Sequence, residues 1–144
     1  MSTTTEPPAD GRITTERLDR IFAIGIDRPR KLNGFSPKML VELAQAYTAL
    51  ERDEEAWVGL LYAHGDNFTA GLELDKVAPV MRERGTVFPV GAVDPLALRP
   101  PARTKPLVAA VQGICFTLGI ELMLAAAAPA DRPRRQGIPC HARA

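Results

Sequence analysis

Segments with the apolar pattern of β-strands alternate along the chain with segments that have the apolar spacing of α-helices, and this alternation predicts the fold class. Residues 21–27 carry apolar side chains at both odd and even positions, which is typical of a strand covered on both faces. Further strand-like runs occupy residues 13–17, 57–63 and 107–111. Within these runs we expect strand positions at Phe22, Ile24, Ile26, Leu60, Val108 and Ala110.

Helical spacing separates these runs. Ser36-Pro37 is typical of a helix start, because the hydroxyl can cap the first turn and proline needs no amide donor there. A helix over about 37–52 should then pack through Leu40, Leu43 and Tyr47, which recur at helical spacing. Strands that alternate with helices predict an α/β fold.

The second half continues the alternation with a longer interruption. Residues 72–84 can begin a helix that Pro79 limits. Proline recurs without a clear period over 87–105, which predicts a long loop of the kind that often covers a site. Residues 118–127 predict a buried helix, and we expect an exposed apolar surface on it around Leu122, Met123 and Leu124.

Composition narrows the function classes. The 144 residues carry 18 basic and 17 acidic side chains, so we expect no nucleic-acid partner. Cys115 and Cys140 lack the spacing of a metal site or a disulfide framework, which favours no metal and a reducing, cytoplasmic location. Residues 1–10 have neither signal-peptide nor transit-peptide character, and we expect a disordered lead-in there.

A membrane-anchored small protein is a remote alternative. Residues 107–128 are long enough to span a bilayer, which takes about 20 residues. Gln112 and Glu121 lie inside this stretch, and Gly113 and the strand-like residues before it argue against one continuous helix. We therefore expect no membrane partner.

The first candidate for chemistry is the segment from His64 to Leu74, which follows a strand-like run. It predicts a tight turn that contains glycine and then a helix start, where backbone amides point outward and can hold an oxyanion. An ordinary strand-to-helix loop is the simpler interpretation of the segment taken alone.

The second candidate is the segment from Lys105 to Leu122, in which a strand again ends at glycine and a helix follows. Glu121 lies in the first turn of that helix, inside an apolar run. Its carboxylate could act as a general acid or base, or could simply favour the positive end of the helix dipole.

Together the two segments resemble the signature segments of the crotonase superfamily, the enoyl-CoA hydratase/isomerase family. Residues 28–36 also resemble the stretch that precedes the first long helix in that family. The resemblance covers about residues 11–126 and implies the N-terminal part of a crotonase-like ββα spiral. It implies an acyl-CoA thioester as substrate and no separate cofactor, and intact relatives form homotrimers or hexamers.

The resemblance also implies roles for particular residues. The backbone amides of Leu72 and Leu118 match the two oxyanion-hole donors, and Glu121 matches one of the two catalytic carboxylates of the hydratases. The positions matching the CoA-binding backbone are Arg30, Lys31, Leu32, Ala70, Gly71, Leu72, Glu73 and Leu74.

Three departures from the family pattern stand out. The family often has aspartate where Glu73 stands, and a glycine run where Thr117-Leu118-Gly119 stands. Family domains are also considerably longer than this chain, and the region of the second glutamate holds Cys140 and His141 instead.

The last residues set a limit on the expected function. Alanine, proline and arginine dominate residues 127–144, which we interpret as a frameshifted tail, with a genuine disordered basic tail as the alternative. We therefore expect a truncated member of the family whose activity is absent or reduced. A non-catalytic CoA- or partner-binding fragment is the other function class.

Overall fold

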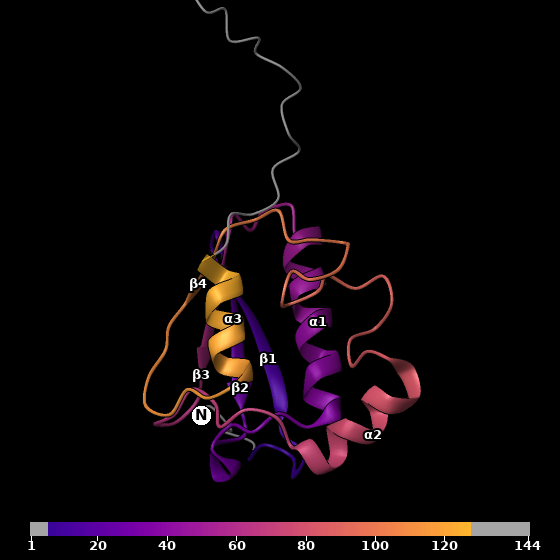
Figure 1. The fold of residues 1–144 in the computed structure, drawn as a ribbon. Helices are drawn as coiled ribbons and strands as arrows, with labels where there is room; N and C mark the ends of the chain where they lie inside the picture. Colours follow the sequence, from indigo (N-terminus) through magenta and orange to yellow (C-terminus); the bar gives the residue numbers. More distant parts are fainter. Residues whose placement is uncertain (1–5, 128–144) are drawn as a thin grey trace, which may run out of the picture.

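The computed structural model describes residues 6–127 as a four-stranded sheet with helices packed against it (Figure 1). The strands are β1 (Arg12–Leu18), β2 (Ile21–Asp27), β3 (Val58–Ala63) and β4 (Leu107–Ala109), and they lie in that order. The β1–β2 pair is antiparallel, whereas β2–β3 and β3–β4 are parallel. Because β3 and β4 run the same way, the segments that follow them leave the sheet at the same edge.

The helices are a short 3-10 turn η1 (Pro29–Lys31) and α1 (Pro37–Arg52), α2 (Leu74–Arg84) and α3 (Leu118–Ala127). In Figure 1, α3 is drawn over the strands, α1 stands beside β1, and α2 lies beyond α1. The start of α1 is capped as predicted, because the Ser36 hydroxyl accepts a hydrogen bond from the Met39 amide at 3.3 Å. Helix α1 contacts β1 and β2, whereas α3 contacts β4.

The core forms between β2 and α1, as the apolar pattern predicts. Six of the seven β2 residues are buried, which confirms a strand covered on both faces. Leu40, Leu43 and Tyr47 of α1 are almost completely buried in the same cluster as Ile24 and Ile26. The predicted bounds of β2, α1 and α3 are confirmed, and no helix or strand occurs over residues 85–106.

Three expectations are corrected. Strand β4 ends at Ala109, so Ala110 is outside it; the Ala110 amide still donates to the Leu61 carbonyl at 2.8 Å, but the chain then turns away. Helix α2 continues through Pro79, where it loses one helical hydrogen bond. The expected apolar surface on α3 is also smaller than predicted, because Leu122 is fully buried, whereas Leu124 is 62% exposed.

The stretch considered as a membrane span is not one helix, because β4 and a series of turns precede α3. Within residues 6–127, no helix combines the length and apolar character needed to cross a bilayer.

The described part of the predicted lead-in contacts the fold. The carbonyl of Ala9 accepts from the Arg28 side chain at 3.0 Å, and that of Asp10 accepts from the Ser36 hydroxyl at 2.7 Å. Residues 1–5 and 128–144 lie outside the described residues. The expectations about the tail, Cys140 and His141 concern that part of the chain.

Candidate active site

The two candidate segments lie side by side at the edge of the sheet where β3 and β4 end. The amides of Phe68 and Thr69 donate to the carbonyls of Gln112 and Ile114, at 2.8 and 3.0 Å. The amide of Phe116 returns a hydrogen bond to the Thr69 carbonyl at 3.1 Å. The turn after β3 therefore runs alongside the turn after β4, and each leads toward one predicted amide donor.

The first turn holds Leu72 with its amide unpaired. The Gly71 carbonyl accepts from the Phe35 amide at 2.8 Å, and the Glu73 amide donates to the Phe35 carbonyl at 2.9 Å. These bonds bracket Leu72, whose own amide donates to no group among the described residues. Gly71 has φ +100°, a conformation that glycine adopts without a steric penalty.

The second turn holds Leu118 at the start of α3. The first amides of a helix have no partner within the helix, and the Leu118 amide donates to no other group in residues 6–127. The helix dipole adds partial positive charge at this end. Thr117 makes the turn in the left-handed region with φ +41°, although the family often places glycine here.

Leu72, Leu118 and Glu121 all line one cavity of about 230 Å³. Most of its wall is apolar and comes from α1, α2 and the loop after α2: Leu40, Val77, Met81, Val87, Phe88, Leu96 and Leu98. Glu121 is exposed, and α3 carries it to the cavity. The structure thus brings together the three residues for which the family resemblance implies chemistry.

Asp94 is a second carboxylate in the wall of this cavity. It is buried, and its oxygens accept hydrogen bonds from the amides of Leu96, Leu98 and Arg99 at 2.9–3.2 Å. Asp94 therefore holds the loop in shape. Glu121 is the carboxylate of the cavity that has no such partners within residues 6–127.

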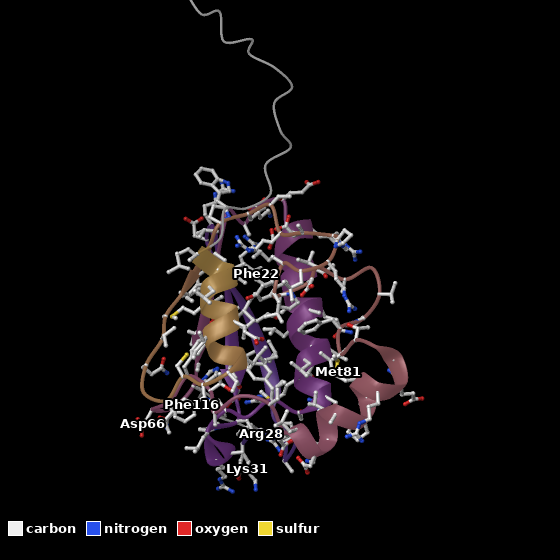
Figure 2. All side chains as sticks on the ribbon, viewed as in Figure 1. Phe22, Arg28, Lys31, Asp66, Met81 and Phe116 are labelled. Atoms are coloured by element: carbon white, nitrogen blue, oxygen red, sulfur yellow. The ribbon has the colours of Figure 1, made fainter. Side chains whose placement is uncertain are left out.

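The predicted CoA-binding positions lie around the first turn. Arg30 and Lys31 are exposed on η1, and Figure 2 shows Lys31 at the same end of the fold as Arg28. The Ala70 amide donates to the Leu32 carbonyl at 2.9 Å, which joins residues 30–32 to residues 70–74. A second cavity, of about 300 Å³, lies between residues 6–9 and the three basic side chains of Arg28, Arg30 and Lys31.

Glu73 is held in an ion pair beside the Leu72 amide. Its carboxylate lies 2.9 Å from Arg28, which is only 4% exposed, and 3.3 Å from Lys76. The neighbouring Arg28, and after it Lys76, lower the pKa of Glu73 below its ordinary value because each favours the charged carboxylate. Its side chain therefore anchors the turn to the rest of the fold.

Sequence reasoning missed a buried polar cluster beneath both turns. The Asn33 side-chain amide donates to the carbonyls of His64 and Asn67 at 2.8 and 2.7 Å, and its oxygen accepts from the Arg28 amide. The Thr69 hydroxyl donates to the Asn33 carbonyl. Asn33-Gly34 predicts only a turn, and nothing in its local pattern indicates that the asparagine is buried.

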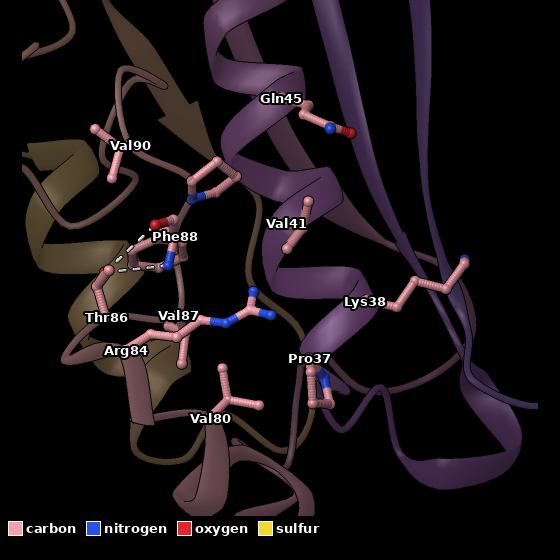
Figure 3. Close-up of a pocket in the computed structure, with 11 residues that line it drawn as sticks. Pro37, Lys38, Val41, Gln45, Val80, Arg84, Thr86, Val87, Phe88 and Val90 are labelled. Carbon is pink, nitrogen blue, oxygen red and sulfur yellow. Dashed lines mark hydrogen bonds between the residues drawn. The ribbon is translucent and has the colours of Figure 1, made fainter. Parts of the chain in front are cut away.

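A larger cavity, of about 900 Å³, lies elsewhere, between α1, the end of α2 and residues 86–90 (Figure 3). Lys38 and Arg84 line it together with Val41 and Val80. None of the predicted site residues contributes to it, so its size does not mark the chemistry. Residues 86–88 line both this cavity and the smaller one.

No group of three or more histidine, cysteine or acidic side chains within residues 6–127 is arranged to hold a metal ion. Cys115 is a half-buried free thiol beside the second turn.

Comparisons with known proteins identify the family that the chain resembles. A family model described as enoyl-CoA hydratase/isomerase matches residues 16–129. The chain is 33% identical over 105 residues to a probable peroxisomal enoyl-CoA hydratase of Arabidopsis thaliana, covering 73% of this chain and 38% of that one. It is 27% identical over 123 residues to a mevalonyl-coenzyme A hydratase of Aspergillus fumigatus, covering 85% and 45%.

A solved structure, a probable enoyl-CoA hydratase/isomerase from Mycobacterium abscessus, is similar with a TM-score of 0.73 and 39% identity. The match covers 79% of this chain and 44% of that one. The chain thus spans less than half the length of these relatives.

Proposed function

The chain belongs to the enoyl-CoA hydratase/isomerase family, and on this premise we propose that it binds an acyl-CoA thioester and polarises the thioester carbonyl through a backbone oxyanion hole. Its fold is the crotonase-like α/β fold of that family, as the two segments predicted. The donors of the oxyanion hole are the amides of Leu72 and Leu118, and Glu121 is the acid–base group.

One observation carries the proposal: Leu72 and Leu118, whose backbone amides have no partner among the described residues, line the same cavity as the Glu121 carboxylate. A carbonyl oxygen that accepts from both amides gains stabilisation as negative charge develops on it, because the donors are already oriented and the wall is largely apolar. The position of Leu118 at the first turn of α3 adds the positive end of a helix dipole. Leucine at both positions is compatible with this role, since only the backbone donates.

Polarisation of the carbonyl makes the neighbouring carbon easier to deprotonate and a conjugated double bond easier to attack. In either reaction, Glu121 would accept or return the proton from its place in the cavity wall. Addition of water needs one proton taken from water and another delivered to carbon, and the hydratases use two carboxylates for this. The described residues supply Glu121 alone, because Asp94 is occupied by backbone amides. We therefore propose that the chain binds and polarises the substrate, with little or no turnover.

A non-catalytic CoA- or partner-binding fragment is the second candidate function. It is favoured by the short span of the match and by the exposed apolar residues of α3. The two functions differ in one measurable property, because a fragment that only holds CoA leaves the thioester carbonyl unperturbed.

The experiment combines calorimetry with infrared spectroscopy of bound crotonyl-CoA that carries ¹³C at the thioester carbonyl. We expect binding together with a lower carbonyl stretching frequency in the complex. Leu118→Pro removes the amide donor, and proline is tolerated at the first position of a helix. Leu118→Ala removes the same buried side chain but keeps the donor, so it is the matched control.

The proline variant should lose most of the frequency shift, and the alanine variant should keep it. Equal shifts in the two variants would overturn the oxyanion-hole role of Leu118. Binding without any shift in the unmodified chain would favour the non-catalytic function.

A further inference from the structure

Thr69 occupies a central position between the two amide-bearing turns. It is fully buried, at 0% exposure, and follows Phe68 in the segment after β3. Its backbone and its side chain both make polar contacts, and these contacts divide between the two turns.

The side chain faces the first turn. The hydroxyl donates to the Asn33 carbonyl at 2.6 Å and accepts from the Gly71 amide at 3.0 Å. Gly71 directly precedes Leu72, so the hydroxyl fixes the peptide group next to the first amide donor. Through Asn33 the same hydroxyl joins the turn to residues 64 and 67.

The backbone and the methyl group face the second turn. The Thr69 amide donates to the Ile114 carbonyl at 3.0 Å, and its carbonyl accepts from the Phe116 amide at 3.1 Å. A β-carbon placed on Gly119 would lie 2.7 Å from the Thr69 methyl carbon, so the methyl packs closely against the residue after Leu118.

We propose that Thr69 is a positioning residue that sets the spacing between the amides of Leu72 and Leu118; this inference rests on the proposed oxyanion hole. Two donors stabilise one oxygen only when both reach it within hydrogen-bonding distance, and a displacement of about 1 Å weakens that stabilisation. Any residue other than proline at position 69 would retain the backbone bonds to the second turn. The bond to the first turn requires the hydroxyl, which ties the two donors into one unit.

Thr48 offers a matched control for the loss of a hydroxyl. Its hydroxyl donates to the Ala44 carbonyl at 2.8 Å and accepts from the Val93 amide at 2.9 Å, the same pair of bonds that Thr69 makes. It lies on α1 and touches neither amide-bearing turn. Thr48→Val therefore measures what the loss of such bonds does to stability alone.

The test compares Thr69→Val and Thr48→Val with the unmodified chain, by thermal melting, by the affinity for crotonyl-CoA and by the stretching frequency of its ¹³C-labelled carbonyl. We expect Thr69→Val to lose at least half of the frequency shift while its affinity stays within about threefold, since the CoA contacts remain. Thr48→Val should keep the full shift whatever its melting temperature.

If the valine variant does not fold, Thr69→Ser and Thr69→Ala test the same role, because these two variants differ only by the hydroxyl. The serine variant should keep the shift and the alanine variant should lose it. A full shift in Thr69→Val, or equal shifts in the serine and alanine variants, would overturn the positioning role while leaving the oxyanion hole intact. No shift in the unmodified chain would instead overturn the proposed function itself.

Discussion

Gly71 and Thr117 are in direct contact: a β-carbon added to Gly71 would overlap the hydroxyl oxygen of Thr117. Each of the two residues has a positive φ, and each directly precedes one of the unpaired amides, those of Leu72 and Leu118. The two turns therefore support each other, and a change in either turn should displace both amides.

Gly71→Ala should damage both stability and carbonyl polarisation. At φ +100° a side chain is strained, and the new carbon would also meet Thr117, so we expect a loss of about 2 kcal/mol or more in the free energy of unfolding. Gly91→Ala is the control, because Gly91 has φ +81° but no neighbouring atom within 4 Å. Chemical denaturation of both variants checks the prediction, which fails if the two losses are equal.

Thr117→Gly should stabilise the second turn. A threonine at φ +41° is strained, and relief of the strain exceeds the extra entropy of a glycine in the unfolded chain, leaving a gain of about 1 kcal/mol. The same change removes the hydroxyl that Gly71→Ala would overlap. The variant that carries both Gly71→Ala and Thr117→Gly should therefore have a higher free energy of unfolding than the two single changes predict when added. Strict additivity would contradict the contact.

Tyr47→Phe should stabilise the protein and remove a loss of stability in alkali. The Tyr47 hydroxyl is buried without a hydrogen-bond partner among the described residues, and its removal should gain about 1 kcal/mol. Burial raises the pKa of Tyr47 above its ordinary value, so the folded state holds this proton more tightly than the unfolded state. The stability of the unmodified chain should fall as the pH rises past about 10, and denaturation curves should show a smaller fall for the variant.

Glu73→Gln should remove a loss of stability in acid. Arg28 and Lys76 lower the pKa of Glu73, so its contribution is complete above the ordinary value of about 4.3 and is lost as the pH falls through the lowered pKa. Glutamine would also leave the buried Arg28 without its carboxylate, at a cost of about 2 kcal/mol near neutral pH. Denaturation between pH 7 and pH 3 should show the variant and the unmodified chain converging toward acid; parallel curves would contradict it.

The outer face of α3 should drive self-association. Ile120 and Leu124 are 44% and 62% exposed, and their spacing of four residues places them on the same side of the helix. Leu124→Lys should lower the average mass measured by light scattering. Val90→Lys, at a 98% exposed valine of the loop after α2, should leave the mass unchanged.

The sequence predicted the elements best where the apolar pattern has only one solution. Strand β2 is apolar on both faces, and α1 has a single apolar stripe with a capped start, so both were predicted with their observed bounds. Helix α3 is apolar all round, and the pattern therefore could not decide which face is covered; the structure buries Leu122 and exposes Leu124.

The site was predictable only where the family resemblance names positions. Leu72, Leu118 and Glu121 line one cavity, but nothing local connects a residue at 72 with one at 118. Thr69 and Asn33 are small polar residues in loops, a class that is usually exposed. Their burial follows from the parallel arrangement of β3 and β4, which brings two distant turns to one edge of the sheet.

The most direct test of the account is the NMR response of the two backbone amides to an acyl-CoA. Crotonyl-CoA added to the ¹⁵N-labelled chain should move the amide protons of Leu72 and Leu118 downfield, because both would donate to the thioester oxygen. Free CoA, which has no such carbonyl, should perturb residues 30–32 and leave these two amides in place. Binding of crotonyl-CoA with no downfield shift at Leu72 and Leu118 would contradict the oxyanion hole.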